Sequence, residues 1–280
     1  GLKYIYRLSK NTTEQDYSGK EAAVSSFFNH STNIAASYME WNAQYGKWNF
    51  RPGMRYEFSR LKGSYPKGNG NPYSCNLNDF VPSVNILYKL NDENSIQYNY
   101  AMSINRPGIN YLNPAVVVQP ESKSYGNTKL KSSRSSQMAL TWTNITSKTT
   151  NQMILAYGFT DNFLTNVDFM TDNIRTTTYA NALHVLMASF MDFLQWTPSQ
   201  KTRISMNCTL GWMKDYFPEQ GLYNKGLYGN VNGNISQKLF WNILLNVGGG
   251  ASFGHNLSGL YGRTANYHSD YLSLQRSFLK

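Results

Sequence analysis

The sequence is short of charge and of long apolar runs. Charged residues make up 15% of the 280 residues, against roughly a quarter in typical soluble domains. A membrane-spanning helix needs roughly 18 consecutive apolar residues, and the longest candidate, 182–194, is interrupted by His184, Ser189 and Asp192. The low charge therefore disfavours an ordinary soluble surface, and the short apolar runs exclude a transmembrane helix.

Cysteine and histidine are also scarce, which narrows the possible chemistry. Cys75 lies in a segment rich in Gly, Asn and Pro, whereas Cys208 falls inside an expected strand, so no disulfide between them is expected. None of the four histidines shows metal-ligand spacing. We therefore predict no metal site and no cofactor.

Catalytic motifs are equally hard to find. Ser258 lies near His255, with Asp270 further on, but no motif joins them into a hydrolase site. Gly248-Gly249-Gly250 precedes neither a helix nor a P-loop lysine, so we interpret it as room for a close approach or bend in a strand. The sequence predicts that the protein is not an enzyme.

Aromatic residues, by contrast, are abundant. The chain contains 21 Tyr, 14 Phe and 6 Trp, yet its mean hydropathy is −0.49 because polar residues are interleaved with the apolar ones. A transmembrane β-barrel has this composition, since its outside faces lipid and its inside is wet.

The apolar residues recur with a period of two, as in strands. Between Trp48 and Ser59 apolar and polar positions alternate, and the same pattern recurs from Ile96 to Asn105. We expect Tyr98, Tyr100 and Met102 to face lipid, and Gln97, Asn99 and Ser103 to face the lumen. A soluble β-sandwich shows the same alternation, so this pattern does not by itself settle the environment.

Two strands fit the alternation poorly. Pro52 removes a backbone donor inside a strand, which predicts a bulge or a sheet edge. The parity between Leu183 and Trp196 is mixed, which indicates a strand covered on both faces.

The connections between the expected strands alternate in length, which is the most useful clue to organisation. Tight polar turns fall at 45–47, 91–94, 147–149 and 197–200, and longer segments fall at 61–79, 106–133, 215–224 and 256–264. Outer-membrane barrels have short periplasmic turns and long outer loops. The sequence thus predicts an all-β, antiparallel transmembrane β-barrel in the outer membrane of a Gram-negative cell.

The net charge of +10 and the pI of about 9.4 require that nucleic acid be considered as a partner. However, Lys and Arg are scattered singly in loops and at strand ends, as at Lys62, Lys67 and Arg134. We expect no nucleic-acid partner, and interpret the cations as a rim in contact with outer-membrane lipid and lipopolysaccharide.

Several segments resemble the outer-membrane β-barrel family of Bacteroidetes, which is similar to the barrels of TonB-dependent receptors. The hairpin 32–60 contains a GKW turn followed by GMRYE, and 81–114 contains an ND turn and NRP followed by YLNP. Tyr125-Gly126-Asn127 with Leu130-Lys131 resembles the family's YGNPxLKPE, although Thr128 and Ser132-Ser133 depart from it.

The resemblance implies a complete protein with an N-terminal plug, a TonB-contacting segment and about twenty-two strands. Residues 1–280 are expected to form a single barrel domain, a partial barrel of a larger receptor, with no plug of its own. The implied function is uptake of a nutrient or complex ligand, with a TonB-type energising protein acting through segments outside this chain. The alternative is a structural or adhesive surface barrel that binds partners through its outer loops.

The longest loop, 106–133, is the expected ligand-binding surface because recognition residues concentrate in variable outer loops. Its cations, aromatics and amides suit polar or anionic ligands. The candidates are Arg106, Asn110, Tyr111, Asn113, Lys123 and Tyr125. The alternative is that the prolines and asparagines only fold the loop over the rim.

Overall fold

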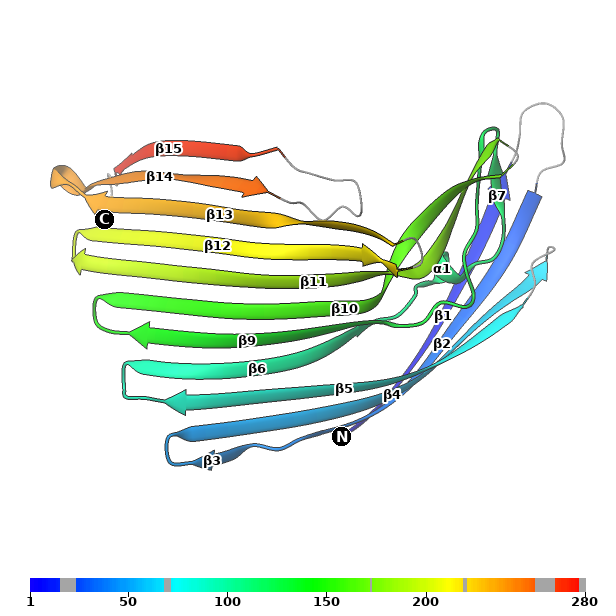
Figure 1. The fold of residues 1–280 in the computed structure, drawn as a ribbon, viewed down its shortest axis with the longest axis horizontal. Helices are drawn as coiled ribbons and strands as arrows, with labels where there is room; N and C mark the ends of the chain where they lie inside the picture. The colour runs from blue at the N-terminus through cyan, green and yellow to red at the C-terminus, as the bar shows by residue number, and fades with distance from the viewer. Residues whose placement is uncertain (16–23, 68–71, 172, 219–220, 255–264, 277–280) are drawn as a thin grey trace.

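The computed structural model describes residues 1–15, 24–67, 72–171, 173–218, 221–254 and 265–276 (Figure 1). The elements, in chain order, are β1 (Leu2–Gln15), β2 (Val24–Glu40), β3 (Ala43–Tyr45), β4 (Trp48–Lys67), β5 (Tyr73–Lys89), β6 (Asn94–Asn105), α1 (Ile109–Leu112), β7 (Val117–Gln119), β8 (Ser122–Ser124), β9 (Ser133–Ile145), β10 (Thr149–Thr171), β11 (Ile174–Ser199), β12 (Thr202–Phe217), β13 (Leu222–Lys238), η2 (Phe240–Asn242), β14 (Ile243–Gly254) and β15 (Tyr267–Arg276). The described segments contain no helix long and apolar enough to span a bilayer.

All strands belong to one 15-stranded sheet, whose main path runs β1-β2-β4-β5-β6-β9-β10-β11-β12-β13-β14-β15. Every neighbouring pair on this path is antiparallel. Strands that follow one another in the chain are therefore neighbours in space, as in an up-and-down barrel. Among the described residues, β1 and β15 each pair on one side only, so the sheet is an open segment of a barrel wall.

The connections at one end of the sheet are all short, as the sequence predicted. Those joining β3 to β4, β5 to β6, β9 to β10 and β11 to β12 lie at the left of Figure 1, and the long segment between β6 and β9 lies at the right. The expected long segments 61–79 and 215–224 were wrong, because the strands continue to pair there: β4 ends at Lys67 and β5 begins at Tyr73, and β12 ends at Phe217 and β13 begins at Leu222. At the short end, the turn between β3 and β4 places Gly46 at φ +56°, a conformation that favours glycine.

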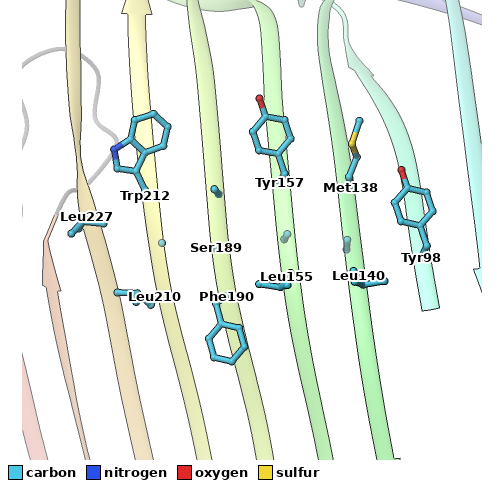
Figure 2. A pocket seen from close by; sticks show the side chains of 14 residues that line it. Tyr98, Met138, Leu140, Leu155, Tyr157, Ser189, Phe190, Leu210, Trp212 and Leu227 are labelled. Carbon is cyan, nitrogen blue, oxygen red and sulfur yellow. The ribbon is translucent and has the colours of Figure 1, made fainter. Parts of the chain in front are cut away.

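Strand register places large apolar side chains in rows on one face of the sheet. Tyr98 pairs with Leu140, Leu140 with Leu155, Leu155 with Phe190 and Phe190 with Leu210. These side chains cross five strands on the same side (Figure 2), and all five are largely exposed. We call this the outer face, because an exposed apolar band of this kind suits contact with lipid.

The alternate positions form the inner face, which is mostly polar or small. Gln97 pairs with Thr141, and Met191 pairs with Thr209 on the same side. One register step away, Asn99 is followed across the sheet by Ala139, Ala156, Ser189 and Gly211. The separation of Tyr98 from Gln97 and Asn99 onto opposite faces agrees with the alternation in the sequence.

Two strands are much longer than a membrane crossing requires. β10 has 23 residues and β11 has 26, which at about 3.3 Å per residue corresponds to roughly 75 to 85 Å. A transmembrane strand needs only about 9–11 residues. Since the short turns mark the periplasmic end, the distal half of this hairpin extends beyond the outer membrane surface.

The proline in β4 is accommodated differently from the expectation. β4 is an interior strand, and Pro52 keeps an unbroken register with β5, opposite Val84. On the other side the ladder is interrupted between β2 and β3, and Trp41 donates its backbone N–H to the Pro52 carbonyl at 3.0 Å. The missing donor is thus tolerated by a break in the neighbouring strand, and neither a bulge in β4 nor a sheet edge is present there.

The mixed parity of β11 has a structural basis. β10 and β11 change register between Thr160 and Phe163, where Asn162 adopts φ +54°. Beyond this irregularity Ala182 and Leu183 are both buried, although they are consecutive. The strand is therefore covered on both faces near the bulge, but the same expectation was wrong from Phe190 to Trp196, where Phe190 on the outer face and Phe193 on the inner face are both exposed.

The remaining local predictions also hold. Cys75 and Cys208 are free thiols. A side chain at Gly248 would collide with the Tyr271 ring, and one at Gly250 with the Asn232 amide. The glycine run therefore provides the close approach expected of it.

Candidate ligand-facing site on the inner wall

Two buried carboxylates stand side by side on the inner face near the long-loop end. Glu57 on β4 pairs directly with Asp79 on β5, and they are only 5% and 1% exposed. Buried charges of the same sign are costly unless cations and hydrogen bonds compensate them. The structure supplies these from both ends of the loop that joins β6 to β9.

Arg106, the first residue after β6, makes the entry contact of this loop. Its guanidinium contacts the Glu57 carboxylate and lies 3.9 Å (Nε) from Asp79 Oδ2. Arg55, beside Glu57 on β4, also contacts Glu57. Burial, and secondarily the charge of Arg55, lower the pKa of Arg106.

The exit of the loop is held by the same carboxylate. Ser132 donates its hydroxyl to Asp79 Oδ2 at 2.9 Å, and Arg134 Nη2 lies 3.4 Å from Asp79 Oδ1. The two ends of a loop of more than twenty residues therefore converge on Asp79, so the ion cluster fixes where the loop enters and leaves the wall.

An apolar cluster anchors the middle of the loop. Leu112 at the end of α1 is 0% exposed and Leu130 is 2% exposed, and both belong to a buried cluster with Leu61 on β4 and Leu77 on β5. Because Leu61 and Leu77 share the face of Glu57 and Asp79, the loop folds inward over the wall.

Asn113 and Gly126 fix the path of the loop. The Asn113 side-chain oxygen accepts the Tyr65 hydroxyl at 2.5 Å and the Ala115 N–H at 3.1 Å. Its backbone oxygen accepts the Gly126 N–H at 2.7 Å. A Cβ at Gly126 would lie 2.5 Å from that same oxygen, so only glycine allows the two backbones to approach this closely.

The loop continues to a third region of the wall. β7 and β8 form a small hairpin, and β8 pairs in parallel with β11, which places Lys123 opposite Thr176. Tyr125 then donates its backbone N–H to the Thr177 carbonyl at 3.2 Å. The loop thus runs from β6 to β11 before returning to β9.

The six residues predicted to bind ligand therefore lie in one loop but in different environments. Arg106 and Asn113 make the contacts that fold the loop. Asn110 and Tyr111 are exposed, with the Tyr111 ring edge-on to Tyr179 at 4.7 Å. Lys123 and Tyr125 are half-exposed beside β11.

Nearer the short-turn end, the inner face of β6 and β9–β13 carries a groove of about 640 Å³. Its lining combines amides and hydroxyls with softer apolar groups: Gln97, Asn99, Gln137, Thr141, Gln152, Ile154, Met187, Met191, Thr209 and Tyr228. The row of small residues described above forms its floor. Sequence analysis assigned Gln97 and Asn99 to the lumen but did not single out a site here; the available signal was the polar parity of several strands taken together.

A second feature that sequence analysis missed is an aromatic cluster near the loop. The Phe28 ring packs against those of His30, Tyr65 and Tyr73, and lies 5.0 Å from the Tyr65 ring. His30 is buried. Since Tyr65 also holds Asn113, this cluster extends the support of the loop to β2.

The remaining chemical candidates do not form a site in the part of the chain that the structure describes. Within those ranges no three His, Cys, Asp or Glu side chains gather as metal ligands. His255 and Ser258 lie outside the described residues, whereas Asp270 lies on β15 opposite Gly249.

The Outer membrane protein beta-barrel family matches residues 1–280. The chain belongs to this family. It is therefore an outer-membrane protein, as its alternation and turn lengths predicted.

Solved structures share the fold at low sequence identity. The siderophore receptor PirA of Pseudomonas aeruginosa is 10% identical with a TM-score of 0.62, over 100% of this chain and 55% of the receptor. The ferric yersiniabactin uptake receptor FyuA of Yersinia pestis is 14% identical with a TM-score of 0.62, over 98% and 42%. The copper transporter OprC is 10% identical with a TM-score of 0.60, over 93% and 41%.

This chain thus spans about half the length of these solved relatives. No curated protein sequence matches it. The similarity confirms the predicted fold, a barrel wall like those of these solved proteins.

Proposed function

We propose that this chain is a wall segment of a TonB-dependent-receptor-like transporter that takes up a nutrient or complex ligand across the outer membrane. The observation that carries the proposal is the inner face, where a long outer loop folds inward at one end, fixed by buried ion pairs, and a polar groove lies toward the other end. A barrel used only for adhesion has little need of a loop directed toward its own interior.

The proposal includes a larger assembly. The family membership, the two unpaired edges among the described strands and the half-length match to receptors support a single barrel unit completed by further strands. In that assembly a TonB-type protein energises uptake through segments outside this chain. The GKW and NRP motifs support an origin in Bacteroidetes, and the absence of a recognised catalytic motif supports a protein without enzymatic activity.

Within the loop, we assign two roles to the six candidate residues. Arg106 and Asn113 position the loop through Glu57 and Tyr65. Asn110, Tyr111, Lys123 and Tyr125 offer amide, aromatic and ammonium groups at or near the surface, and such groups suit a polar or anionic ligand.

Uptake by the complete protein in its native host tests the proposal. Cells with and without the gene receive iron–siderophore complexes, copper, cobalamin and oligosaccharides, with and without a protonophore. We expect the deletion to abolish energy-dependent accumulation of at least one of these solutes. Unchanged accumulation of every solute, together with lost surface adhesion, would instead establish the adhesive barrel.

A triple variant then tests the loop. Asn110→Ala/Tyr111→Ala/Lys123→Ala is expected to reduce accumulation of the identified solute at least tenfold while the barrel still assembles, since one such polar contact contributes about one factor of ten. The matched control, Asp92→Ala/Lys148→Ala/Lys201→Ala, changes three exposed turn residues at the periplasmic end. Equal uptake by both variants would remove the loop from recognition.

A further inference from the structure

The outer face of the β12–β13 hairpin carries two lysines in an unusual arrangement. Lys214 and Lys225 pair directly across the two strands, and one residue pair further out Tyr216 faces Tyr223. Like charges directly opposite each other destabilise an antiparallel pair. No ion pair with either lysine is formed among the described residues.

The tyrosines hold the ammonium groups without neutralising them. Lys214 Nζ lies 5.2 Å from the centre of the Tyr216 ring and 5.5 Å from that of Tyr223, and Lys225 Nζ lies 5.4 Å from the Tyr223 ring. Cation–π contact orients a lysine while its charge remains available. On β10, the outer-face carboxylate of Asp161 is already paired with His184 at 2.8 Å. The hairpin therefore presents two oriented positive charges side by side.

Lys214 and Lys225 lie at the outer edge of the lipid-facing apolar band. On β12 and β13 the outer row begins with Ile204 opposite Ile235 and ends with Trp212 opposite Leu227, immediately before the lysines. Lys214 lies 12 residues (214 − 202) beyond Thr202, the first residue of β12 at the periplasmic turn. At a rise of about 3.3 Å per residue and a strand tilt of about 40°, this separation is about 30 Å along the barrel axis. An outer-membrane barrel has an apolar band of about 25 Å, so the lysines lie at the level of the outer-leaflet headgroups.

Directly below them the outer face is hollowed. An apolar groove of about 440 Å³ crosses the sheet from β6 to β13, with Trp212 and Tyr157 toward the lysine end and Leu210 and Leu155 deeper in the membrane (Figure 2). The groove exists because Ala188, between Tyr157 and Trp212 in register, is small.

We propose that this surface binds a phosphorylated glycolipid of the lipid A class. The two lysines receive a headgroup phosphate, and the acyl chains lie in the groove over Ala188. The two lysine charges favour a lipid with an anionic headgroup. The wide apolar surface below them favours a lipid with several acyl chains. This inference depends on residence in the outer membrane and is independent of transport.

Binding of defined lipids to the delipidated complete barrel protein tests the site. The probes are bisphosphorylated lipid A, the same lipid A without phosphates, and phosphatidylglycerol, each measured by native mass spectrometry. Because a lysine near an anionic lipid surface contributes about fivefold in affinity, Lys214→Gln/Lys225→Gln is expected to bind bisphosphorylated lipid A about 25-fold more weakly.

The matched control removes the same charge from the other end of the same hairpin. Lys201→Gln/Lys238→Gln is expected to bind like the unmodified protein. Equal affinity of the two double variants overturns the proposal, and so does phosphatidylglycerol binding as tightly as bisphosphorylated lipid A.

Two further variants keep the test decisive if the double variant does not assemble. Lys225→Gln alone, at an exposed position, is expected to lose about fivefold for bisphosphorylated lipid A only. Ala188→Phe, which fills the groove, is expected to weaken both lipid A forms at least fivefold with both lysines intact. If neither variant changes lipid A binding, the surface is not a glycolipid site.

Discussion

The hairpins β4–β5 and β12–β13 follow the same alternation but are covered in different ways. The inner face of β4–β5 is buried under the 106–133 loop, which adds Leu112 and Leu130 to its core and Arg106 to its carboxylates. Across the middle of β12–β13, inner-face residues such as Asn207 and Asn232 remain exposed. The proposed lipid-binding lysines, Lys214 and Lys225, lie on the outer face of this hairpin. Alternation therefore determines which face a side chain occupies, whereas a distant segment determines what covers it.

This difference separates two sources of stability. The β4–β5 wall has buried contacts on its inner face that the chain itself supplies, whereas its outer face carries exposed apolar side chains such as Tyr56 and Phe80. The β12–β13 wall is stabilised by the hydrogen bonds between its strands, by lipid contacts on its outer face and by contacts with the contents of the lumen on its inner face. Substitutions that remove loop contacts should therefore act strongly on the first hairpin and weakly on the second.

The largest effect is expected from Asp79→Ala. The substitution leaves Arg106 and Arg134 without their shared carboxylate and should lower the free energy of unfolding by about 4 kcal/mol, as for a broken buried pair. Urea unfolding of the complete protein in lipid measures the change. Asp92→Ala, in an exposed turn, is the control, and similar values for the two would show that the ion cluster contributes nothing.

Leu112→Ala should follow, with a loss of about 3 kcal/mol from the cavity left in a fully buried cluster. Because the loop loses its apolar anchor, trypsin should also cut after Lys123 or Lys129 much faster. The time course of cleavage on intact cells measures this. Val116→Ala, at an exposed position in the same loop, should leave cleavage unchanged, and rapid cleavage of both would contradict the assigned anchor.

The assignment of faces can be tested with one pair of neighbouring residues. Leu155→Lys puts a charge on the outer face near the middle of the band and should cost about 2 kcal/mol. Ala156→Lys points into the wet inner groove and should cost less than about 0.5 kcal/mol. Urea titrations in lipid compare the two, and the reverse order would mean that the faces are exchanged.

The smallest effect concerns the tip of the β10–β11 hairpin, beyond the membrane. Hydrogen bonds from Arg175 and then from Thr177 lower the pKa of Asp168. A carboxyl whose pKa is lowered in the folded state stabilises that state at pH values above its unfolded pKa of 3.8. This stabilisation disappears as the pH falls through the folded-state pKa. Amide exchange at 168–177 should therefore accelerate below pH about 4, and Asp168→Asn should remove that acceleration. If amide exchange in the Asp168→Asn variant keeps the same pH dependence, Asp168 is not the group responsible.

Much of the architecture was predictable because it depends on local pattern. The rows containing Tyr98 and Gln97 face opposite ways as their parity indicated, and tight turns such as Tyr45-Gly46-Lys47 lie at one end. These features need only the period of a strand and the preferences of turn residues. Pro52 departs from prediction because the response to its missing donor occurs in a neighbouring strand.

The site was less predictable because it depends on long-range pairing. In the sequence, Glu57 and Asp79 fall at polar positions of the strand alternation. Their partners Arg106 and Ser132 come from a loop whose inward path no local pattern indicates. The opposition of Lys214 and Lys225 likewise emerges only from the register of β12 against β13. Predicting either would require knowing the three-dimensional neighbours in advance.

The convergence of both loop ends on Asp79 also bears on how the protein can evolve. Arg106 and Ser132 hold the two ends of the loop together at Asp79, so a longer or shorter interior adds only a small closure cost, about 0.6 kcal/mol for each doubling of length. Exposed positions such as Asn110 can then change freely while the wall keeps its register. A new ligand specificity can therefore arise by replacing the interior of the loop, with the strands that cross the membrane left unaltered.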